Sequence, residues 1–134
     1  MNKDVKRRDE IIFGKYDETK YSGGLRSFTC TREVIEKLIE EDFIDLEECQ
    51  NYSPTTQEFM DMTDPESGVT NVEFQCYAIS PDRNDYRVTI EGVDVEIQDN
   101  DFDSLTNVIN AFRSADEFNI GHYAPSFFVH AWWD

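Results

Sequence analysis

An alternation of apolar and polar side chains through residues 71–97 constrains the fold more than any other feature of the chain. The stretch NVEFQCYAIS has Val, Phe, Cys and Ala at every second position, and the stretches YRVTIE and VDVEI repeat the alternation on either side of Gly92. Side chains two residues apart point to the same face of a strand, so this pattern is typical of half-buried strands. The sequence predicts an antiparallel meander of three strands with one face open to water, over residues 71–80, 86–91 and 93–97.

Three other segments have the spacing of helices. Residues 31–44 carry one apolar stripe with a period of 3.6 residues, and acidic side chains occupy the opposite side. Residues 53–64 begin with Ser-Pro, an N-cap followed by proline at the first helical position, and a second proline follows their end. Residues 99–118 contain a third apolar stripe, with Asp101 or Asp103 available as the N-cap. We expect a helix in each segment.

Both tryptophans lie in the last ten residues, PSFFVHAWWD, whose alternation predicts a closing strand after a short strand at 118–120. Helices segregated onto one face of an antiparallel meander sheet give an α+β fold, here a two-layer sandwich. We expect one row of the closing strand under the helices and the other row facing outward or into a partner: Phe127, Val129, Ala131 and Trp133 in the first, and Phe128, His130 and Trp132 in the second. A one-residue slip in register would exchange the rows.

The net charge of −17 is unevenly divided along the chain. Residues 1–26 hold seven basic and five acidic side chains, a net of +2, whereas residues 27–134 hold five basic and twenty-four acidic ones, a net of −19. We expect a basic N-terminal arm followed by a single acidic α+β domain. Such a domain repels nucleic acid and anionic membranes but attracts a basic protein surface. Salt tolerance or solubility is the alternative explanation of the acidity.

The cysteine pattern and the hydropathy indicate a cytoplasmic protein. Three cysteines with irregular spacing argue against a disulfide framework and favour a reducing compartment. No apolar run has the length of a membrane span, and the first residues lack the apolar segment of a secretory signal.

The candidates for chemistry are few. His122 and His130 both fall in the C-terminal strand pair, and with Cys76 on another strand they could be drawn as a zinc site, but their spacing is unlike that of common zinc modules. A nucleophile–base pair of Cys76 or Cys49 with His130 and a carboxylate is the other possibility. Buried cysteine in a strand is usually a small apolar core residue. We therefore expect no enzyme activity, no cofactor and no metal.

Two polar segments have competing interpretations. In CQNYSPTTQEF, the residues Gln50, Asn51 and Tyr52 follow one another between two predicted helices, where such side chains satisfy helix ends and tight turns. The alternative is a polar recognition loop. The acids of DNDFD, at residues 99–103, resemble the start of a calcium loop, but the glycine and glutamate that such a loop needs are missing. We interpret them as helix-capping acids.

Four segments, FIDLEECQNYSPTTQEF, YAISPDRNDYRVTIEGVDVE, FRSADEF and the terminal AWWD, resemble a group of small, acidic, uncharacterised proteins of halophilic archaea and some bacteria. The resemblance runs from about residue 25 to the end and leaves out the basic arm. That group has no activity, ligand or partner attached to it, so the resemblance implies no catalytic residues. It does favour salt tolerance as a reason for the acidity.

The leading hypothesis from sequence is a non-enzymatic interaction module that binds a basic protein partner. The partner-binding residues would be Phe128, His130 and Trp132 together with Gln50, Asn51 and Tyr52, because aromatic residues ringed by charge are typical of binding hot spots. An immunity-type inhibitor or a nucleic-acid mimic fits this description. The alternatives are a small hydrolase or transferase that uses Cys76 and His130 with a carboxylate, and a self-associating structural protein, a possible homodimer.

Overall fold

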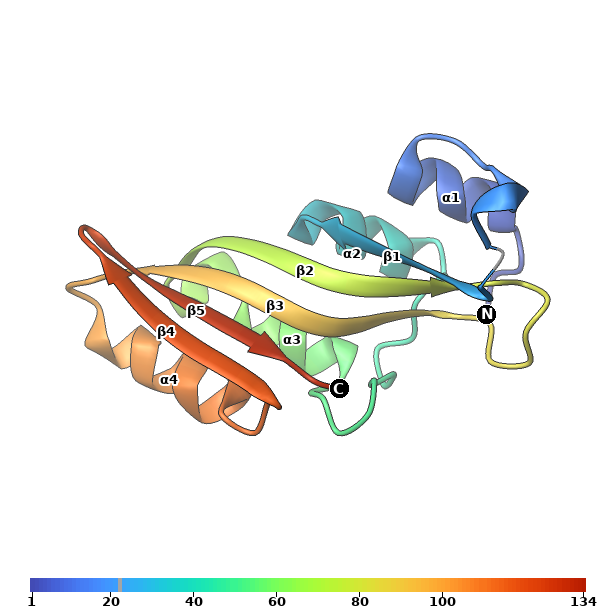
Figure 1. Cartoon of the computed structure of the whole chain (residues 1–134). Helices are drawn as coiled ribbons and strands as arrows, with labels where there is room; N and C mark the ends of the chain where they lie inside the picture. Colours follow the sequence, from blue (N-terminus) through green and yellow to red (C-terminus); the bar gives the residue numbers. More distant parts are fainter. Residues whose placement is uncertain (22) are drawn as a thin grey trace.

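The computed structural model describes residues 1–21 and 23–134, and its main feature is a five-stranded antiparallel sheet (Figure 1). The strands lie in the order β1-β2-β3-β5-β4. Their bounds are Leu25–Cys30 for β1, Val69–Ile79 for β2, Val88–Gln98 for β3, Glu117–Tyr123 for β4 and Ser126–Trp132 for β5. The helices are α1 Val5–Phe13, α2 Arg32–Glu40, α3 Thr56–Met62 and α4 Phe102–Phe112, with short 3-10 helices η1 Glu18–Tyr21 and η2 Pro65–Ser67.

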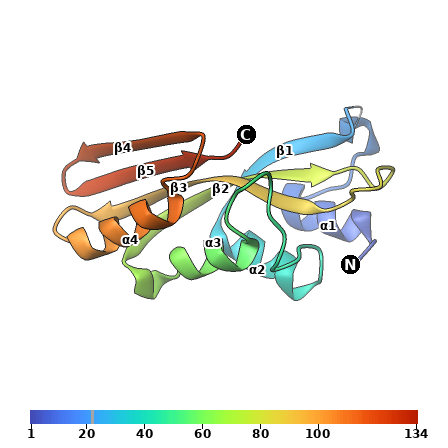
Figure 2. The ribbon, with the colours of Figure 1, turned by 90° about the horizontal axis from the view of Figure 1, so that it is seen from below.

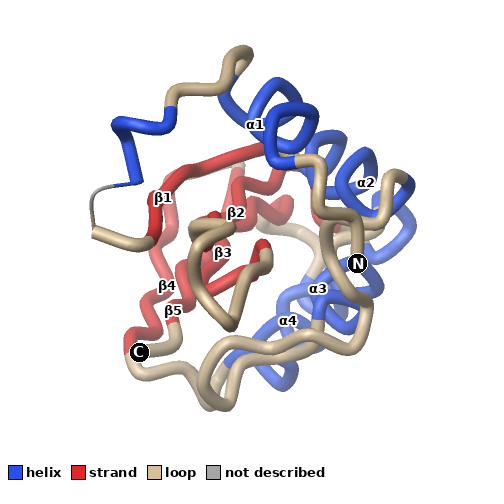
Figure 3. The backbone as a smooth tube through the Cα atoms, turned by 90° about the vertical axis from the view of Figure 1, so that its right-hand side faces the viewer, coloured by secondary structure: helices blue, strands red, loops and turns tan. Residues whose placement is uncertain are grey.

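The helices and the sheet form the two layers of the predicted α+β fold. Figure 3 shows them as separate layers, with the strands on one side and α2, α3 and α4 on the other. The core lies between these layers, where apolar side chains of β2, β3 and β5 meet those of the helices. None of the described helices combines the length and the apolar character that a membrane span requires.

Gly92 does not end a strand as the sequence suggests, because the last two strands expected within residues 71–97 are one continuous strand, β3. The pairing of β3 with β2 shifts by one residue between Gln75 and Cys76, which leaves Glu91 as the extra residue of a β-bulge. The bulge returns the apolar side chains after Gly92 to the buried face. The buried apolar side chains of β3 therefore lie at even-numbered positions before the bulge and at odd-numbered positions after it.

β1 is a strand that the sequence pattern did not predict. It pairs along its whole length with β2, from Leu25 opposite Ile79 to Cys30 opposite Phe74. Its sequence, LRSFTC, does not separate apolar from polar residues by alternate position, and most of its side chains are half-buried. The extended conformation of β1 therefore depends on its pairing with β2 and not on an alternation of apolar and polar residues.

Residues 1–21, the greater part of the expected basic arm, form α1 and η1 and attach to the end of the sheet. The fully buried Arg8 donates hydrogen bonds of 2.8 Å to the carbonyl oxygen of Ile79 and to the hydroxyl oxygen of Tyr21. Its Nε lies 2.9 Å from the carboxylate of Asp9, which is also fully buried. A buried charge is costly unless it is paired and hydrogen-bonded, so this network holds α1 against β2.

Side chains cap the starts of α3 and α4 as the sequence predicts, but α3 starts at a later residue. α3 begins two residues later than expected, because Thr55 and not Ser53 is the N-cap. Thr55 Oγ1 accepts from the backbone N–H of Glu58, and the Glu58 carboxylate accepts from the N–H of Thr55, which is a capping box. α4 begins after Asp101, whose carboxylate accepts from the N–H of Ser104 at 3.1 Å.

The closing strand β5 buries the row that the sequence predicts. Val129 and Ala131 are buried, and Trp133, just beyond the strand, is only 2% exposed. The ring of Trp133 lies 5.6 Å from that of Phe59 and 6.0 Å from that of Phe112, measured between centroids. The terminal aromatic segment therefore closes the core with one row and leaves the alternate row on the other face of the sheet.

Candidate functional site

The candidate site is the face of the sheet that is turned away from the helices. Figure 2 shows α2, α3 and α4 all on the opposite side of the sheet. Cross-strand neighbours point to the same face, so the pairing of the strands identifies the outward side chains. Three rungs of four residues, which we call the open face, run across β2, β3, β5 and β4: Asn71, Glu96, Phe128 and Gly121; Glu73, Asp94, His130 and Asn119; Gln75, Gly92, Trp132 and Glu117.

The open face carries four carboxylates and no lysine or arginine. The carboxylates are those of Glu73, Asp94, Glu96 and Glu117. Arg26 is the one lysine or arginine in the five described strands, and it pairs with the buried Ala78, which places it on the helix side of the sheet. Its guanidinium lies 3.4 Å from the centroid of the Phe13 ring. Carboxylates grouped without cations produce a negative potential over this face.

Several of the cations are paired with acids elsewhere on the molecule. Arg7 lies 2.7 Å from Glu41, and Arg32 lies 2.9 Å from Glu36, both among the helices. Arg87, just before β3, lies 2.9 Å from Glu48 of the loop between α2 and α3. These pairs offset part of the acidity outside the open face, where twenty-five of the twenty-nine acids and all the lysines and arginines of the chain lie.

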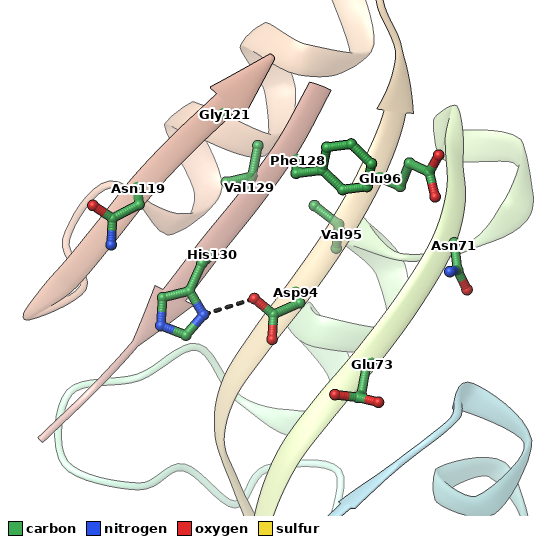
Figure 4. A pocket seen from close by; sticks show the side chains of 10 residues that line it. All are labelled: Asn71, Glu73, Asp94, Val95, Glu96, Asn119, Gly121, Phe128, Val129 and His130. Carbon is green, nitrogen blue, oxygen red and sulfur yellow. Dashed lines mark hydrogen bonds and ion pairs between the residues drawn. The ribbon is translucent and has the colours of Figure 1, made fainter. Parts of the chain in front are cut away.

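His130 occupies the middle of the open face between two carboxylates. Its Nδ1 lies 2.7 Å from Asp94 Oδ1 on β3 (Figure 4). Its Nε2 lies 3.4 Å from Glu117 Oε1 on β4. Asp94 Oδ2 also accepts a hydrogen bond of 2.6 Å from Gln75 Nε2. The two Asp94 oxygens are thus engaged, and Glu96 Oε1 accepts a hydrogen bond of 2.8 Å from Ser126 Oγ. The exposed Glu73 is therefore the more available acid in the rung of the histidine.

Gly92 makes room for Trp132 on the open face. A Cβ atom placed on Gly92 would lie 2.6 Å from Gln75 Oε1 and 3.1 Å from Trp132 Cδ1, both closer than ordinary contact. The absence of a side chain at this position lets the Gln75 amide and the Trp132 indole approach each other across β3. Trp132 is therefore seated on the sheet while one side of it stays partly exposed.

A shallow pocket of about 500 Å³ lies over the first two rungs. Figure 4 shows the ring of Phe128 reaching from β5 across Val95 toward Glu96, with the carboxylate of Glu73 farther along β2. Phe128 is 41% exposed, because its cross-strand neighbour on β4 is Gly121. An accessible aromatic ring thus lies beside acidic side chains in one depression.

One acid beyond the three rungs is engaged inside the protein. Glu91, the bulge residue, is almost completely buried. Its carboxylate accepts a hydrogen bond from Tyr77, and this bond together with burial raises the pKa of Tyr77 to about 12. Tyr77 therefore keeps its hydroxyl proton at neutral pH.

The structure separates the two groups of predicted partner-binding residues. Phe128, His130 and Trp132 lie together on the open face, whereas the other three belong to the loop between α2 and α3. Gln50 Oε1 accepts a hydrogen bond of 2.8 Å from Arg87, and the backbone N–H of Gln50 donates to Ser53 Oγ at 3.0 Å. Asn51 adopts a positive φ of 51°, and Tyr52 is 98% exposed. Gln50 and Asn51 thus shape the loop, and the side chain of Tyr52 is almost fully exposed on it.

The residues that could have formed a catalytic or zinc site are not assembled. Cys76 is fully buried on the core face, where burial is the main cause that raises the pKa of its thiol. His130 lies on the opposite face of the sheet. His122 pairs with Phe127 of the core-side row, and its Nε2 lies 3.0 Å from Asp99. Within the described residues, no group of three His, Cys, Asp or Glu is arranged to hold a metal ion.

Sequence reasoning singled out the aromatic row but not the carboxylates that surround it. Each of these carboxylates occupies a polar position in the alternation of its strand: Glu73, Asp94, Glu96 and Glu117. That alternation was the one signal that could have identified them. No family model, no curated protein and no solved structure matches the chain. The resemblance to small acidic proteins of halophilic archaea stays a prediction.

Proposed function

We propose that this protein is a non-enzymatic interaction module whose open face binds a basic protein partner. The observation that carries the proposal is the concentration of four carboxylates, without lysine or arginine, around Phe128, His130 and Trp132. A charged face of one sign steers a partner of opposite charge, and exposed aromatic rings supply the buried contacts that hold it.

Salt tolerance alone accounts less well for this arrangement. Acidity that serves only hydration needs no preferred face, and it gives no reason to leave aromatic rings exposed among the acids. On the open face the acids and the rings share the same rungs, so a partner that neutralises the carboxylates also covers Phe128 and Trp132. Charge and apolar area then contribute to the same contact.

Nucleic-acid-binding proteins are the partner class that fits this chemistry best. Their binding surfaces are basic because they neutralise phosphates, and a rigid sheet that presents carboxylates competes for the same cations. Inhibition of such a partner, in the manner of an immunity protein or a nucleic-acid mimic, is the corresponding function. A nucleic acid added in excess should then displace the protein from its partner.

Affinity capture from cell lysate, followed by binding measurements with the recovered partner, tests the proposal. We expect one basic protein in stoichiometric amount, with an affinity that falls as salt rises. The double variant Glu73→Lys with Glu96→Lys should abolish capture, and Trp132→Ala should weaken binding by about 2 kcal/mol, the scale of a hot-spot residue.

The matched control is the double variant Glu47→Lys with Glu66→Lys, which changes the net charge equally at exposed positions outside the open face. This control should retain most of the affinity. Equal losses in both double variants, or only non-stoichiometric binding that disappears with modest salt, would refute a specific surface.

A further inference from the structure

β4 is an edge strand with the features of a pairing surface. It pairs with β5 on one side, and no described strand lies on its other side. Its seven residues, EFNIGHY, contain no proline, lysine or arginine, and its register with β5 shows no irregularity. Proteins usually protect an edge with such residues, with bulges or with a covering segment, because free backbone groups recruit another strand.

The other edge strand, β1, packs against the N-terminal residues. η1 contacts β1, and the Arg26 side chain of β1 stacks on Phe13 of α1. The ring of Phe13 also packs edge-on against Phe28 of the same strand, with centroids 5.6 Å apart. The N-terminal residues therefore pack on the side chains of β1, whereas β4 is a regular edge strand along its whole length.

The side chains of β4 are unusually apolar for an exposed strand of so acidic a protein. Ile120 is 45% exposed and Tyr123 is 74% exposed. Glu117 is the single acid among the seven residues. A partner strand would bury these apolar groups without bringing many carboxylates together.

We propose that a second copy of this chain pairs with β4 in antiparallel register about a two-fold axis at Ile120. Ile120 is the middle residue of β4, so this axis is the one that pairs the strand over its full length. The pairs between one copy and the other are Ile120 with Ile120, Asn119 with Gly121, Phe118 with His122 and Glu117 with Tyr123. No carboxylate of β4 then faces another, because each Glu117 is opposite a tyrosine.

The pairing extends the sheet and leaves the proposed binding function intact. β5 already has a strand on each side, so its edge is closed to a second copy. Pairing through β4 joins two sheets edge to edge, and the two open faces then lie on the same side of a continuous sheet. A dimer would present twice the acidic area to an extended basic partner.

Salt distinguishes this contact from the binding of a basic partner. Each copy carries a net charge of −17, so the copies repel one another at low ionic strength and associate better when salt screens that repulsion. Binding of a basic partner has the opposite salt dependence. The failure of one proposal is therefore separable from the failure of the other.

Sedimentation of the full chain over a wide range of concentration, at low and high salt, tests the pairing. We expect the mass to rise from 15.7 kDa toward twice that value, more readily at high salt. The variants Ile120→Glu and Ile120→Lys should each be monomeric, because each places like charges opposite one another at the axis. An equimolar mixture of the two variants should recover the dimer.

Tyr52→Glu and Tyr52→Lys, at a fully exposed loop position, are the matched controls and should dimerise like the unmodified chain. Hydrogen exchange of residues 117–123 should slow as concentration rises, while exchange in β1 should not change. A chain that stays at 15.7 kDa under all conditions would overturn the proposal. Dimers that persist in both single variants would overturn it as well, because they would use another surface.

Discussion

Trp132 and Trp133 are adjacent in the chain and lie on opposite faces of the sheet. Trp133 packs edge-on against Phe59 and Phe112 in the core, whereas Trp132 rests over Gly92 on the open face. The pleat of the strand separates the two indoles, so one stabilises the fold and the other is available to a partner. The two tryptophans can be tested independently for the same reason.

Replacement of the buried tryptophan should cost far more stability than replacement of its neighbour. Trp133→Ala leaves a large cavity among aromatic rings, and we expect a loss of about 3–5 kcal/mol in the free energy of unfolding. Trp132→Ala should lose less, because its ring is partly exposed. Urea denaturation monitored by circular dichroism measures both. A similar loss in the two variants would contradict the assignment of the rows.

The buried ion pair of α1 should be essential to the attachment of the N-terminal residues. Arg8→Ala leaves the Asp9 carboxylate buried without its cation, and we expect a loss of about 3–5 kcal/mol in the free energy of unfolding. Arg7→Ala, which breaks a pair with the partly exposed Glu41, should cost far less, because solvent screens that pair. Chemical denaturation of the two variants compares the pairs directly. Equal costs would show that Arg8 is not held as described.

Gly92 should tolerate no side chain. Gly92→Ala places a methyl group against the Gln75 amide and the Trp132 ring, and we expect a loss of about 1–3 kcal/mol in the free energy of unfolding. The near-ultraviolet circular dichroism of the tryptophans should also change. Gly23→Ala is the matched control, because a Cβ atom at Gly23 meets nothing within 4 Å. An unchanged Gly92→Ala protein would contradict the seating of Trp132.

The pair of Arg7 and Glu41 should contribute stability that depends on pH. The guanidinium of Arg7 lowers the pKa of Glu41 from its ordinary value of 4.5 to about 2. A carboxylate whose pKa is lower in the folded state stabilises the fold above pH 4.5, and this contribution is lost as pH falls from 4.5 toward 2. Stability measured against pH for the unmodified chain and for Glu41→Gln should differ above pH 4.5 and converge in acid. A difference that persists unchanged at pH 2 would contradict the pairing.

The sequence predicted those elements whose burial repeats with a regular period. The alternation in residues 71–97 and in PSFFVHAWWD identified β2, β3 and β5, and the helical stripes identified α2 and α4. β1 was not predicted, because apolar and polar residues do not alternate along it. The bulge at Glu91 was read as a break because a glycine and a phase change coincide there.

The candidate site could be predicted only in part. The row of Phe128, His130 and Trp132 follows from the period of one strand. The grouping of Glu73, Asp94 and the other carboxylates depends on the strand order, and no local pattern encodes that order. The hydrogen bond between Gln50 and Arg87 joins residues thirty-seven positions apart, so it could not be predicted from sequence for the same reason.

Chemical-shift mapping with a short peptide rich in lysine and arginine tests the central claim most directly. Amide signals of the isotope-labelled protein would be followed as the peptide is added at low salt. We predict that the shifts concentrate on the three rungs of the open face, include the indole N–H of Trp132, and largely disappear in the double variant Glu73→Lys with Glu96→Lys. Shifts spread over the acids of α2, α3 and the connecting loops, with Trp132 unaffected, would contradict the claim that this face is the binding surface.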